Sequence, residues 1–488
     1  MSLHPPSRPL LTLVGSAFGF VLVLLDVSVV NVALDALGTS FGTNVVGLEW
    51  VVNAYTLVFA ALLLMAGALG DRFGARTVFL QGFVLFTLAS VGCGWAPTLG
   101  TLIAARIVQG IGAALLVPNS LALIQQAFPA HEARSRAIGW WGAIAGSSLA
   151  AGPVVGGLLV THFGWRSIFF VNLPVGVIGL AIILRNAHES PKNPGRSLDL
   201  PGQIATVVAL GALATALIDA GRLGWSHPRI VFAGLLALIG IAAFVAIEAR
   251  SKAPMLPLPL FRAPAFAIAS LNGLLINFAY YGMVFVFSLH FQWQMKLTAG
   301  ETGFAFLPMT IVILIVNLVM SRIMAGASPR RLMVFGQCLS AAGYLLLIPA
   351  SMIGSYVALV LPMLMAATGM AVMVPTVTNV TLAAVETSRG GIASGVLNTA
   401  RQVGGMLGVA VFGNLLQENA PSAFAHGMRL SFAVAASLLV FGALLSLLGL
   451  RSARSQRHDG KNCVKSQPAA VATLSPDRAS APQSGKDG

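Results

Sequence analysis

This 488-residue chain carries very little charge: only 9% of its residues are charged, whereas 57% are hydrophobic. A soluble protein usually has about 25% charged residues. Cysteine is scarce as well. Cys93, Cys338 and Cys463 lie far apart and form neither a metal-binding spacing nor an evident disulfide framework. The composition therefore excludes an ordinary soluble domain and indicates a membrane protein.

Motifs for catalysis and for nucleotide binding are also missing. The sequence contains no G-x-x-x-x-G-K-[ST] loop, so ATP is not expected as an energy source. It has no G-x-S-x-G string and no Ser/His/Asp cluster that would indicate hydrolysis. The eight histidines are scattered and show no metal-ligand spacing. We therefore expect no enzymatic activity, no cofactor and no metal.

Long apolar runs take the place of the missing charge. A helix of roughly 20 apolar residues crosses a bilayer, and backbone groups in lipid must satisfy one another within helices. The alternating segments of a transmembrane β-barrel are not seen. We predict an all-α integral membrane protein. Its fourteen predicted transmembrane helices lie at about 10–34, 47–70, 77–96, 100–125, 136–160, 166–185, 200–220, 229–248, 264–290, 301–322, 331–351, 355–380, 392–416 and 428–450.

The basic residues indicate how the chain is oriented. A net charge of +14 on a soluble protein would suggest nucleic acid, but here the basic residues lie between apolar runs, so no nucleic-acid partner is expected. With a cytoplasmic N-terminus, the cytoplasmic loops hold about three times as many Lys and Arg residues as the outer loops. An even number of spans then places both termini in the cytoplasm, in a multi-pass protein of the inner (plasma) membrane.

A weak internal repeat divides the chain. GALGDRFGAR at 67–76 follows the second run, and AGASPRR at 325–331 follows the tenth. Parallel repeats of this kind suit a transporter with its site between two halves. We predict two six-helix halves plus two inserted transmembrane helices. The predicted divisions are 1–186, 187–262 with the inserted helices, 263–450, and a disordered cytoplasmic tail at 451–488.

Two charges interrupt the apolar runs well inside the membrane. Asp26 is the one carboxylate of the first run, and Arg106 begins RIVQGIGAALLVPNS in the fourth. Charges at this depth cost about 2.5–3.5 kcal/mol on insertion scales and usually face a bundle interior or an aqueous cavity. Asp26 either hydrogen-bonds a neighbouring helix or binds and releases a proton during transport. Arg106 must pair with another group or reach water, and on position alone it ties helices together. The sequence does not show whether the two side chains meet.

Other residues within the runs are candidates for a substrate cavity. Tyr280 and Tyr281 offer a stacking surface for a flat amphiphile, although aromatic residues in lipid mostly serve packing. Arg401, flanked by glycines, is expected to tie helices together, and the family resemblance given below implies a conformational or substrate-gate role as the alternative. Few acids lie deep in the runs, so monocations, neutral amphiphiles or planar aromatics are expected rather than dications. The expected cavity residues are Asn31, Tyr55, Gln109, Tyr280, Tyr281 and Arg401.

Two acids near the ends of runs receive structural interpretations. Asp219 lies near the outer end of the seventh run and is expected in solvent or at the membrane interface. Glu248 and Arg250 close the eighth run, and we expect them to form a surface ion pair.

Several strings resemble signatures of the major facilitator superfamily. GALGDRFGAR resembles its cytoplasmic signature between spans 2 and 3, which implies a gate latch. RIVQG resembles the span-4 signature, whose arginine is tied to proton transfer. The fifth run resembles the antiporter signature of drug exporters, with Ser148 where a glycine is usual. The residues carried over are Gly67, Asp71, Arg72, Gly74 and Arg76 for the gate, and Gly139, Ser148, Gly152, Pro153 and Gly156 for the antiporter signature.

Four further strings narrow the resemblance to the fourteen-span drug/proton antiporters of that superfamily. They are LDVSVVNVALD at 25–35, WVVNAYTLVFAALL at 50–63, WRSIFFVNLPVG at 165–176 and GGIASGVLNTARQVGGMLGVAV at 390–411. The resemblance covers residues 15–450. It implies export of drugs or toxic amphiphilic compounds by alternating access, coupled to protons through Asp26 and Arg106.

The partners implied are a small amphiphilic molecule, protons and membrane lipid, and a monomer is compatible with the sequence. Two alternatives share the membrane architecture. One is a dedicated exporter of a single metabolite, such as an antibiotic, a siderophore or an amino-acid derivative. The other is a non-transporting membrane receptor, for which neutralising Asp26 would leave function intact. A channel is disfavoured by the asymmetric gate motif.

Overall fold

The computed structural model describes residues 8–251, 254–324, 326–386, 389–416 and 421–450. Within these ranges the chain is helical and has no strand. Residues up to Leu450 belong to one compact unit. The tail at 451–488, which we predict to be disordered, lies outside the described residues.

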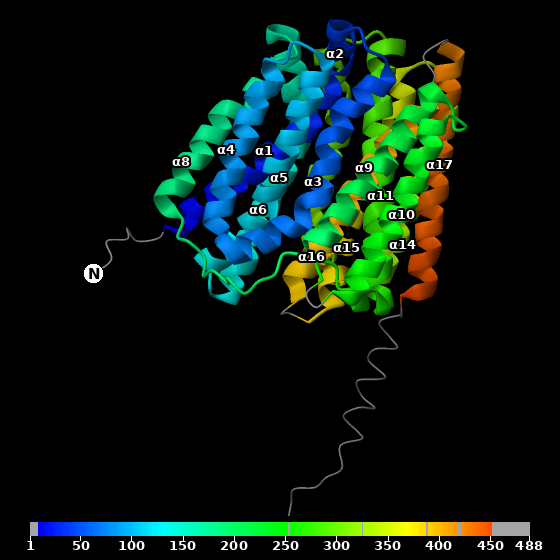
Figure 1. Ribbon diagram of the computed structural model, residues 1–488. Helices are drawn as coiled ribbons and strands as arrows, with labels where there is room; N and C mark the ends of the chain where they lie inside the picture. Colours follow the sequence, from blue (N-terminus) through cyan, green and yellow to red (C-terminus); the bar gives the residue numbers. More distant parts are fainter. Residues whose placement is uncertain (1–7, 252–253, 325, 387–388, 417–420, 451–488) are drawn as a thin grey trace, which may run out of the picture. The chain divides into compact units, whose positions relative to one another are not determined.

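Fourteen long helices run side by side through this unit (Figure 1). They are α1 (Pro9–Val32), α3 (Val45–Phe73), α4 (Ala75–Gly94), α5 (Leu99–Ala127), α6 (His131–Phe163), α8 (Asn172–Asn186), α9 (Leu200–Leu223), α10 (Pro228–Arg250), α11 (Pro264–Leu289), α13 (Leu307–Ile323), α14 (Pro329–Ala350), α15 (Tyr356–Ala383), α16 (Gly390–Leu415) and α17 (Pro421–Gly449). The short elements are α2 (Leu34–Phe41), α7 (Ser167–Phe170), the 3₁₀ helix η1 (Leu258–Arg262), the π-helical segment η2 (His290–Gln294) and α12 (Ala299–Ala305).

The long helices coincide with the fourteen predicted spans. Thirteen helical segments of the described chain are long and apolar enough to cross a membrane. The helix outside this set is α16, which has 26 residues but carries Asn398, Arg401 and Gln402 along its middle. These residues lower its hydropathy. They are tolerated because α16 packs on α11, α3 and α9, and so lies largely within protein.

Helix starts follow the local sequence. Proline occupies the first turn of α1, α9, α10, α11 and α14, where its missing N–H costs no helical hydrogen bond. Thr98 begins α5 with a reciprocal capping box to Thr101, and Thr298 does the same for α12 with Glu301. These signals fix where each helix begins and therefore which residues lie at membrane depth.

The helices form two groups that meet along a few contacts. In the first, α1 packs on α5, α6 and α8, and α5 packs on α3 and α4. In the second, α11 packs on α16, and α14 packs on α15 and α17. The groups meet where α3 lies against α16 and where α6 lies against α12 and α13. The pair α9 and α10 is attached through α9, which contacts α3 and α16. The division into two six-helix halves with two inserted helices stays a prediction. The two helix groups and the separate attachment of α9 and α10 agree with it.

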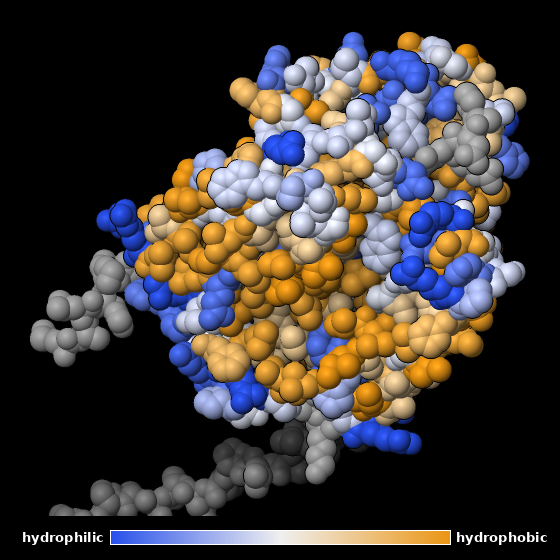
Figure 2. Space-filling model, turned by 45° about the horizontal axis from the view of Figure 1, so that its top comes forward, coloured by the Kyte–Doolittle hydropathy of each residue, from blue (hydrophilic) through white to orange (hydrophobic). Residues whose placement is uncertain are grey.

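The outer surface of the unit is apolar where lipid would cover it. Figure 2 shows hydrophobic side chains over the middle of the visible face and hydrophilic ones gathered towards its edges. The helix α10 illustrates the pattern, since Phe232, Leu238 and Ile239 are each about two-thirds exposed. Such exposure of large apolar side chains is unfavourable in water but favourable in a bilayer.

Candidate functional site

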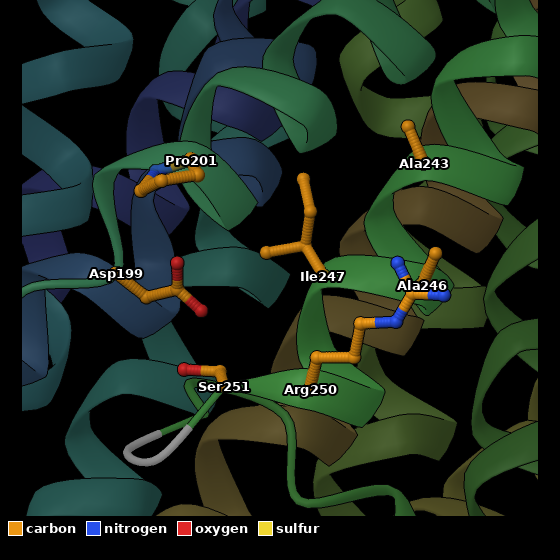
Figure 3. Close-up of a pocket in the computed structure, with 7 residues that line it drawn as sticks. All are labelled: Asp199, Pro201, Ala243, Ala246, Ile247, Arg250 and Ser251. Carbon is orange, nitrogen blue, oxygen red and sulfur yellow. The ribbon is translucent and has the colours of Figure 1, made fainter.

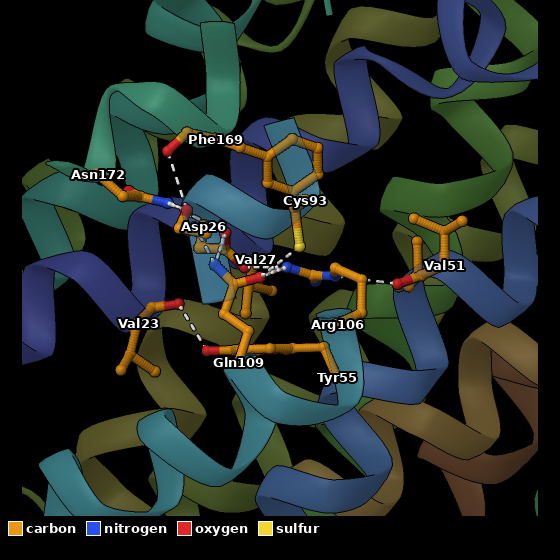
Figure 4. Close-up of polar contacts among 12 residues, drawn as sticks. Val23, Asp26, Val27, Val51, Tyr55, Cys93, Arg106, Gln109, Phe169 and Asn172 are labelled. Carbon is orange, nitrogen blue, oxygen red and sulfur yellow. Dashed lines mark hydrogen bonds and ion pairs between the residues drawn. The ribbon is translucent and has the colours of Figure 1, made fainter. Parts of the chain in front are cut away.

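A buried ion pair joins α1 to α5. Arg106 donates a hydrogen bond from Nη1 to Oδ2 of Asp26, and the two side chains are 1% and 0% exposed. Figure 4 shows the two side chains pointing toward one another within the first helix group. The sequence places both charges within apolar runs, and the fold brings them into contact. Each charge is thereby compensated in a region without water.

Neutral polar side chains complete the shell around the carboxylate. Its second oxygen, Oδ1, accepts hydrogen bonds from Nε2 of Gln109 at 2.7 Å and from Nδ2 of Asn172 at 3.2 Å. Both amides also donate to Oγ of Ser90, at 3.3 and 2.9 Å. Ser90 in turn donates to the backbone carbonyl of Phe169 at 2.9 Å. Side chains or backbone from α1, α4, α5, α7 and α8 thus meet at Asp26.

The guanidinium of Arg106 is held from other directions too. Its Nε donates to the carbonyl of Val51 at 3.1 Å, and Nη1 donates to Oε1 of Gln109 at 2.7 Å. The ring of Tyr55 lies 4.3 Å from the guanidinium carbon, and the ring of Phe169 lies 5.9 Å away. The Tyr55 hydroxyl donates to the carbonyl of Val23 at 3.4 Å. Arg106 is therefore anchored to α3 as well as to α1.

Glycines in α5 allow this close assembly. A Cβ at Gly110 would lie 2.6 Å from the carbonyl oxygen of Tyr55, and one at Gly112 would lie 2.6 Å from the backbone nitrogen of Phe86. Small residues let helix backbones approach in membranes. The string RIVQGIG thus supplies polar groups of the site, Arg106 and Gln109. Its glycines let α5 pack closely against α3 and α4.

Three members of the network were not among the predicted site residues. Asn172 and Ser90 bind the Asp26 shell, and Cys93 donates weakly to Oε1 of Gln109 at 3.6 Å. Asn172 falls in the string WRSIFFVNLPVG, and a lone asparagine in an apolar run is the signal that could have singled it out. Ser90 and Cys93 give no such signal, because small polar residues are common in membrane helices.

The predicted gate loop binds the segment that follows α8. The carboxylate of Glu189 accepts hydrogen bonds from the backbone nitrogens of Arg76 at 2.9 Å and of Thr77 at 3.1 Å, at the start of α4. Gly74 has a φ of +102°, and the Glu189 carboxyl occupies the space where a Cβ would stand. Asp71 is exposed, with an oxygen 4.0 Å from Nε of Arg196.

The other gate residues have simpler surroundings. Arg76 donates from Nη2 to the carbonyl of Leu184 at 2.8 Å, and Arg72 lies over the ring of Phe73 at 5.5 Å. A Cβ at Gly67 would stand 3.8 Å from Pro118, an ordinary contact. In this conformation the gate loop contacts its own helix group and the segment after α8.

The predicted antiporter residues bring α6 onto its neighbours. A Cβ at Gly152 would collide with the side chain of Ser28, and one at Gly156 would meet Val29 at 3.0 Å. The carbonyl of Pro153 approaches Gly303 of α12 in the same way. Gly139 has open space around it, and Ser148 is half-buried. Gly152, Pro153 and Gly156 therefore form a contact between α1, α6 and α12.

Hydrogen bonds between the two helix groups gather at the end of the bundle that carries α2. Ser288 donates to the carbonyl of Asn31, and Nε1 of Trp293 donates to Asp35 at 2.9 Å. The backbone nitrogen of Gly300 donates to Oγ1 of Thr161 at 3.0 Å. These contacts join α1, α2 and α6 to the segment 288–300. These hydrogen bonds therefore hold the two helix groups together at this end of the bundle.

The predicted cavity residues separate into two sets. Tyr55 and Gln109 belong to the Asp26 network, and the Asn31 side chain donates to its own helix at Val27, 2.9 Å away. Tyr280 is buried, whereas Tyr281 and Arg401 are half-buried, in α11 and α16. The structure thus places the second set in the other helix group.

Two interpretations of acids are corrected by the structure. Of the two places expected for Asp219, solvent is wrong: it is 6% exposed and accepts a hydrogen bond from Nε1 of Trp50 at 3.1 Å, because α9 packs on α3. Its place at the membrane interface stays a prediction. Glu248 is 3% exposed and accepts from the backbone nitrogen of Leu256 at 3.1 Å. The described chain therefore does not form the expected ion pair between Glu248 and Arg250.

A pocket of about 450 Å³ lies near this second acid, between α9 and α10. In Figure 3 the side chains of Asp199 and Arg250 lie on opposite sides of it, with Ile247 between them. It is far in sequence from the Asp26 network, and its walls come from Asp199 before α9, from α9 and α10, and from Ser251 after α10.

Comparisons with known proteins agree with one another. A family model described as the Major Facilitator Superfamily matches residues 16–409. The chain is 39% identical over 428 residues to the methylenomycin A resistance protein of Streptomyces coelicolor, covering 88% of this chain and 90% of that one. It is 38% identical to the multidrug resistance protein Stp of Mycobacterium tuberculosis, covering 83% of this chain and 76% of the relative.

A solved structure shares the fold. The crystal structure of a D-xylose-proton symporter superposes with a TM-score of 0.67 and covers 91% of this chain and 98% of its own. The sequence identity is 14%, so the likeness concerns the fold alone.

Proposed function

The chain belongs to the Major Facilitator Superfamily, and from that premise we propose that it exports drugs or other toxic amphiphilic compounds across the plasma membrane in exchange for protons. The observation that carries the proposal is the fully buried carboxylate of Asp26 bound to Arg106. The similarity to a methylenomycin A resistance protein and a multidrug resistance protein supports the outward direction. The cycle involves one chain, a small amphiphile, protons and lipid, with no covalent chemistry.

The described conformation is one stage of that cycle. We assign the end that carries α2 to the outside, in keeping with the excess of basic residues in the loops at the other end. Both termini then lie in the cytoplasm. The hydrogen bonds of Asn31, Asp35 and Thr161 to the segment 288–300 close the outer side in this conformation. Rocking of the two helix groups would open it.

Protonation of Asp26 is the coupling step. A neutral carboxylic acid no longer balances the charge of Arg106, and it offers one acceptor fewer to Gln109 and Asn172. These partners come from α5 and α8, so a proton on α1 changes contacts on two further helices. A proton from outside favours the return of the empty carrier, and substrate binding with deprotonation drives the outward step.

The available driving force is sufficient for uphill export. One charge that moves through the membrane potential gains about 2.3 kcal/mol per 100 mV, and each unit of pH gradient adds about 1.4 kcal/mol. A single coupled proton could therefore sustain a substrate gradient of tens-fold or more.

A dedicated exporter of one compound is the second candidate. The identities to a protein named for resistance to one antibiotic and to a multidrug resistance protein are almost equal, at 39% and 38%. Growth of a susceptible host that produces the chain, on a panel of unrelated toxic compounds, separates the two. Protection against several scaffolds indicates multidrug export, and protection against one indicates a dedicated exporter.

The decisive experiment uses full-length protein in proteoliposomes with an imposed pH gradient. Asp26→Asn should abolish uphill accumulation of substrate and substrate-induced proton movement, while downhill exchange continues. Asp219→Asn is the matched control, because Asp219 is also a buried aspartate with a hydrogen-bonded partner but lies outside the Arg106 network. Uphill transport that survives in Asp26→Asn would contradict the proposal.

A further inference from the structure

The second arginine inside the bundle, Arg401, has a different environment from Arg106. It lies in the middle of α16 and donates from Nη2 to the carbonyl of Val374 at 2.9 Å and to Oγ1 of Thr378 at 2.7 Å. Both acceptors belong to α15 and are neutral. The side chain is half-buried, and its Nε is enclosed without a hydrogen-bond partner.

No carboxylate balances this charge within the described part of the chain. The ion pairs there are Asp26 with Arg106 and Asp71 with Arg196. Arginine stays protonated in proteins, so Arg401 contributes a full positive charge. Charged residues inside membrane segments usually pair with one another or mark a substrate pathway. Arg401 does not pair with an opposite charge in the described chain, so we consider whether it marks a substrate pathway.

Tyr281 connects Arg401 to the meeting surface of the two helix groups. A Cβ at Gly405 would lie 2.8 Å from the Tyr281 ring, so this ring lies against α16 one turn from Arg401. On its other side Tyr281 packs against the hydrophobic cluster that contains Tyr55, whose ring covers Arg106. Tyr281 therefore links α16, one turn from Arg401, to the first helix group.

The charges of the two groups set the chemistry of that region. Asp26 and Arg106 cancel one another, and their polar atoms are engaged in the network described above. A further acid, Glu49 of α3, is 0% exposed, and its carboxylate lies where a Cβ of Gly413 in α16 would stand. Gly413 lies about 18 Å along the helix from Arg401. Arg401 is thus the fixed charge in the middle of α16, and its guanidinium fork matches the geometry of a carboxylate or a similar anion. A cationic ligand at this level of α16 would meet a like charge.

We propose that Arg401 binds the acidic group of an organic anion, with the Tyr281 hydroxyl as a second donor and the Tyr281 ring against its apolar body. The substrate class is a small amphiphile that carries one carboxylate, sulfonate or comparable acid. This inference rests on the proposed export function and defines its substrate. It differs from the expectation drawn from composition, which favoured cations and neutral compounds.

The test measures equilibrium binding to purified full-length protein in lipid nanodiscs. The probes are anilinonaphthalene sulfonate and N-phenylnaphthylamine, which share one aromatic skeleton and differ in the acidic group, and empty nanodiscs correct for partition into lipid. The wild type should bind the sulfonate about tenfold or more tightly than the neutral amine, the ratio expected for a charge-assisted hydrogen bond.

Variants then assign the effect to the guanidinium. Arg401→Gln should remove the preference and leave binding of the neutral amine unchanged, and Arg401→Lys should keep part of it. Thr378→Val is the matched control. It removes one tie between α15 and α16 but keeps the charge, so it should retain the preference. If Thr378→Val and Arg401→Gln weaken both probes equally, Arg401 only holds the helices together and the proposal is overturned.

A measurement on the unaltered protein covers the case in which Arg401→Gln does not fold. Tetraphenylborate and tetraphenylphosphonium have the same shape and opposite charge. The wild type should bind the borate more tightly, and a preference for the phosphonium overturns the proposal. These results are distinct from those on proton coupling. Uphill export of the phosphonium but not of the borate would contradict the anion site and still support proton antiport. Anion binding together with undiminished uphill transport in Asp26→Asn would support the anion site and contradict the role of Asp26 in proton coupling.

Discussion

Two arginines lie inside the helical bundle, and their surroundings differ in one respect. Arg106 meets a carboxylate, an amide oxygen, a backbone carbonyl and two aromatic faces, and it is 1% exposed. Arg401 meets a carbonyl and a hydroxyl and keeps part of its surface open. A charge that the protein balances internally can respond to a proton. A charge that the protein leaves unbalanced can respond to a ligand.

The largest expected effect comes from removing the balanced arginine alone. Arg106→Met leaves Asp26 buried without its counter-ion, and breaking a buried pair in this way typically costs about 3–5 kcal/mol. The melting temperature in detergent should fall strongly. The double variant Asp26→Asn with Arg106→Gln should recover most of the loss, since neither charge remains. Equal stability of the single and the double variants would show that the pair is not the source of the stabilisation.

Removing one neutral hydrogen-bond donor to Asp26 should lower stability less than removing Arg106. Asn172→Ala removes a neutral donor to the carboxylate and with it a hydrogen bond between α1 and α8. The ion pair with Arg106 stays, so we expect the melting temperature to fall by less than in Arg106→Met and uphill transport in proteoliposomes to slow. Asn119→Ala is the control, because that buried amide donates to the carbonyls of Ala66 and Leu115. Uphill transport that slows equally in both variants would contradict the assignment of Asn172 to this shell.

The smallest effect on stability should come from the unbalanced arginine. Arg401→Gln removes two hydrogen bonds but leaves no opposite charge stranded, so the free energy of unfolding should change by about 1 kcal/mol or less. The same thermal unfolding experiment measures it. A loss as large as that of Arg106→Met would mean that the two arginines are alike in structure and that their contrast has no functional meaning.

Helix positions could be predicted from the sequence because a membrane imposes one dominant requirement. The apolar runs match the helices, and the run at 392–416 predicted α16 even though Asn398, Arg401 and Gln402 lower its hydropathy. The identities of Asp26 and Arg106 were also readable, since charges in apolar runs are conspicuous. Their contact was not readable, because the two residues are 80 positions apart and meet only when α1 packs on α5.

The failures share a physical cause. Asp219 was expected in solvent or at the membrane interface because it lies near the end of an apolar run, but the packing of α9 on α3 encloses it beside Trp50. Glu248 was expected to pair with Arg250, but the chain beyond α10 folds back so that Leu256 donates to it. Ser90 and Asn172 join the site through tertiary contacts alone. Helix periodicity says which side chains share a face, and it does not say which other helix covers that face.

The unbalanced cation at Arg401 also has an electrical consequence. If one organic anion leaves for each proton that enters, both movements carry current in the same sense, and every turnover transfers two elementary charges. A membrane potential of 100 mV would then contribute about 4.6 kcal/mol to each cycle. Such a carrier would be electrogenic, and its turnover in vesicles would follow an imposed potassium diffusion potential more steeply than it follows acidity.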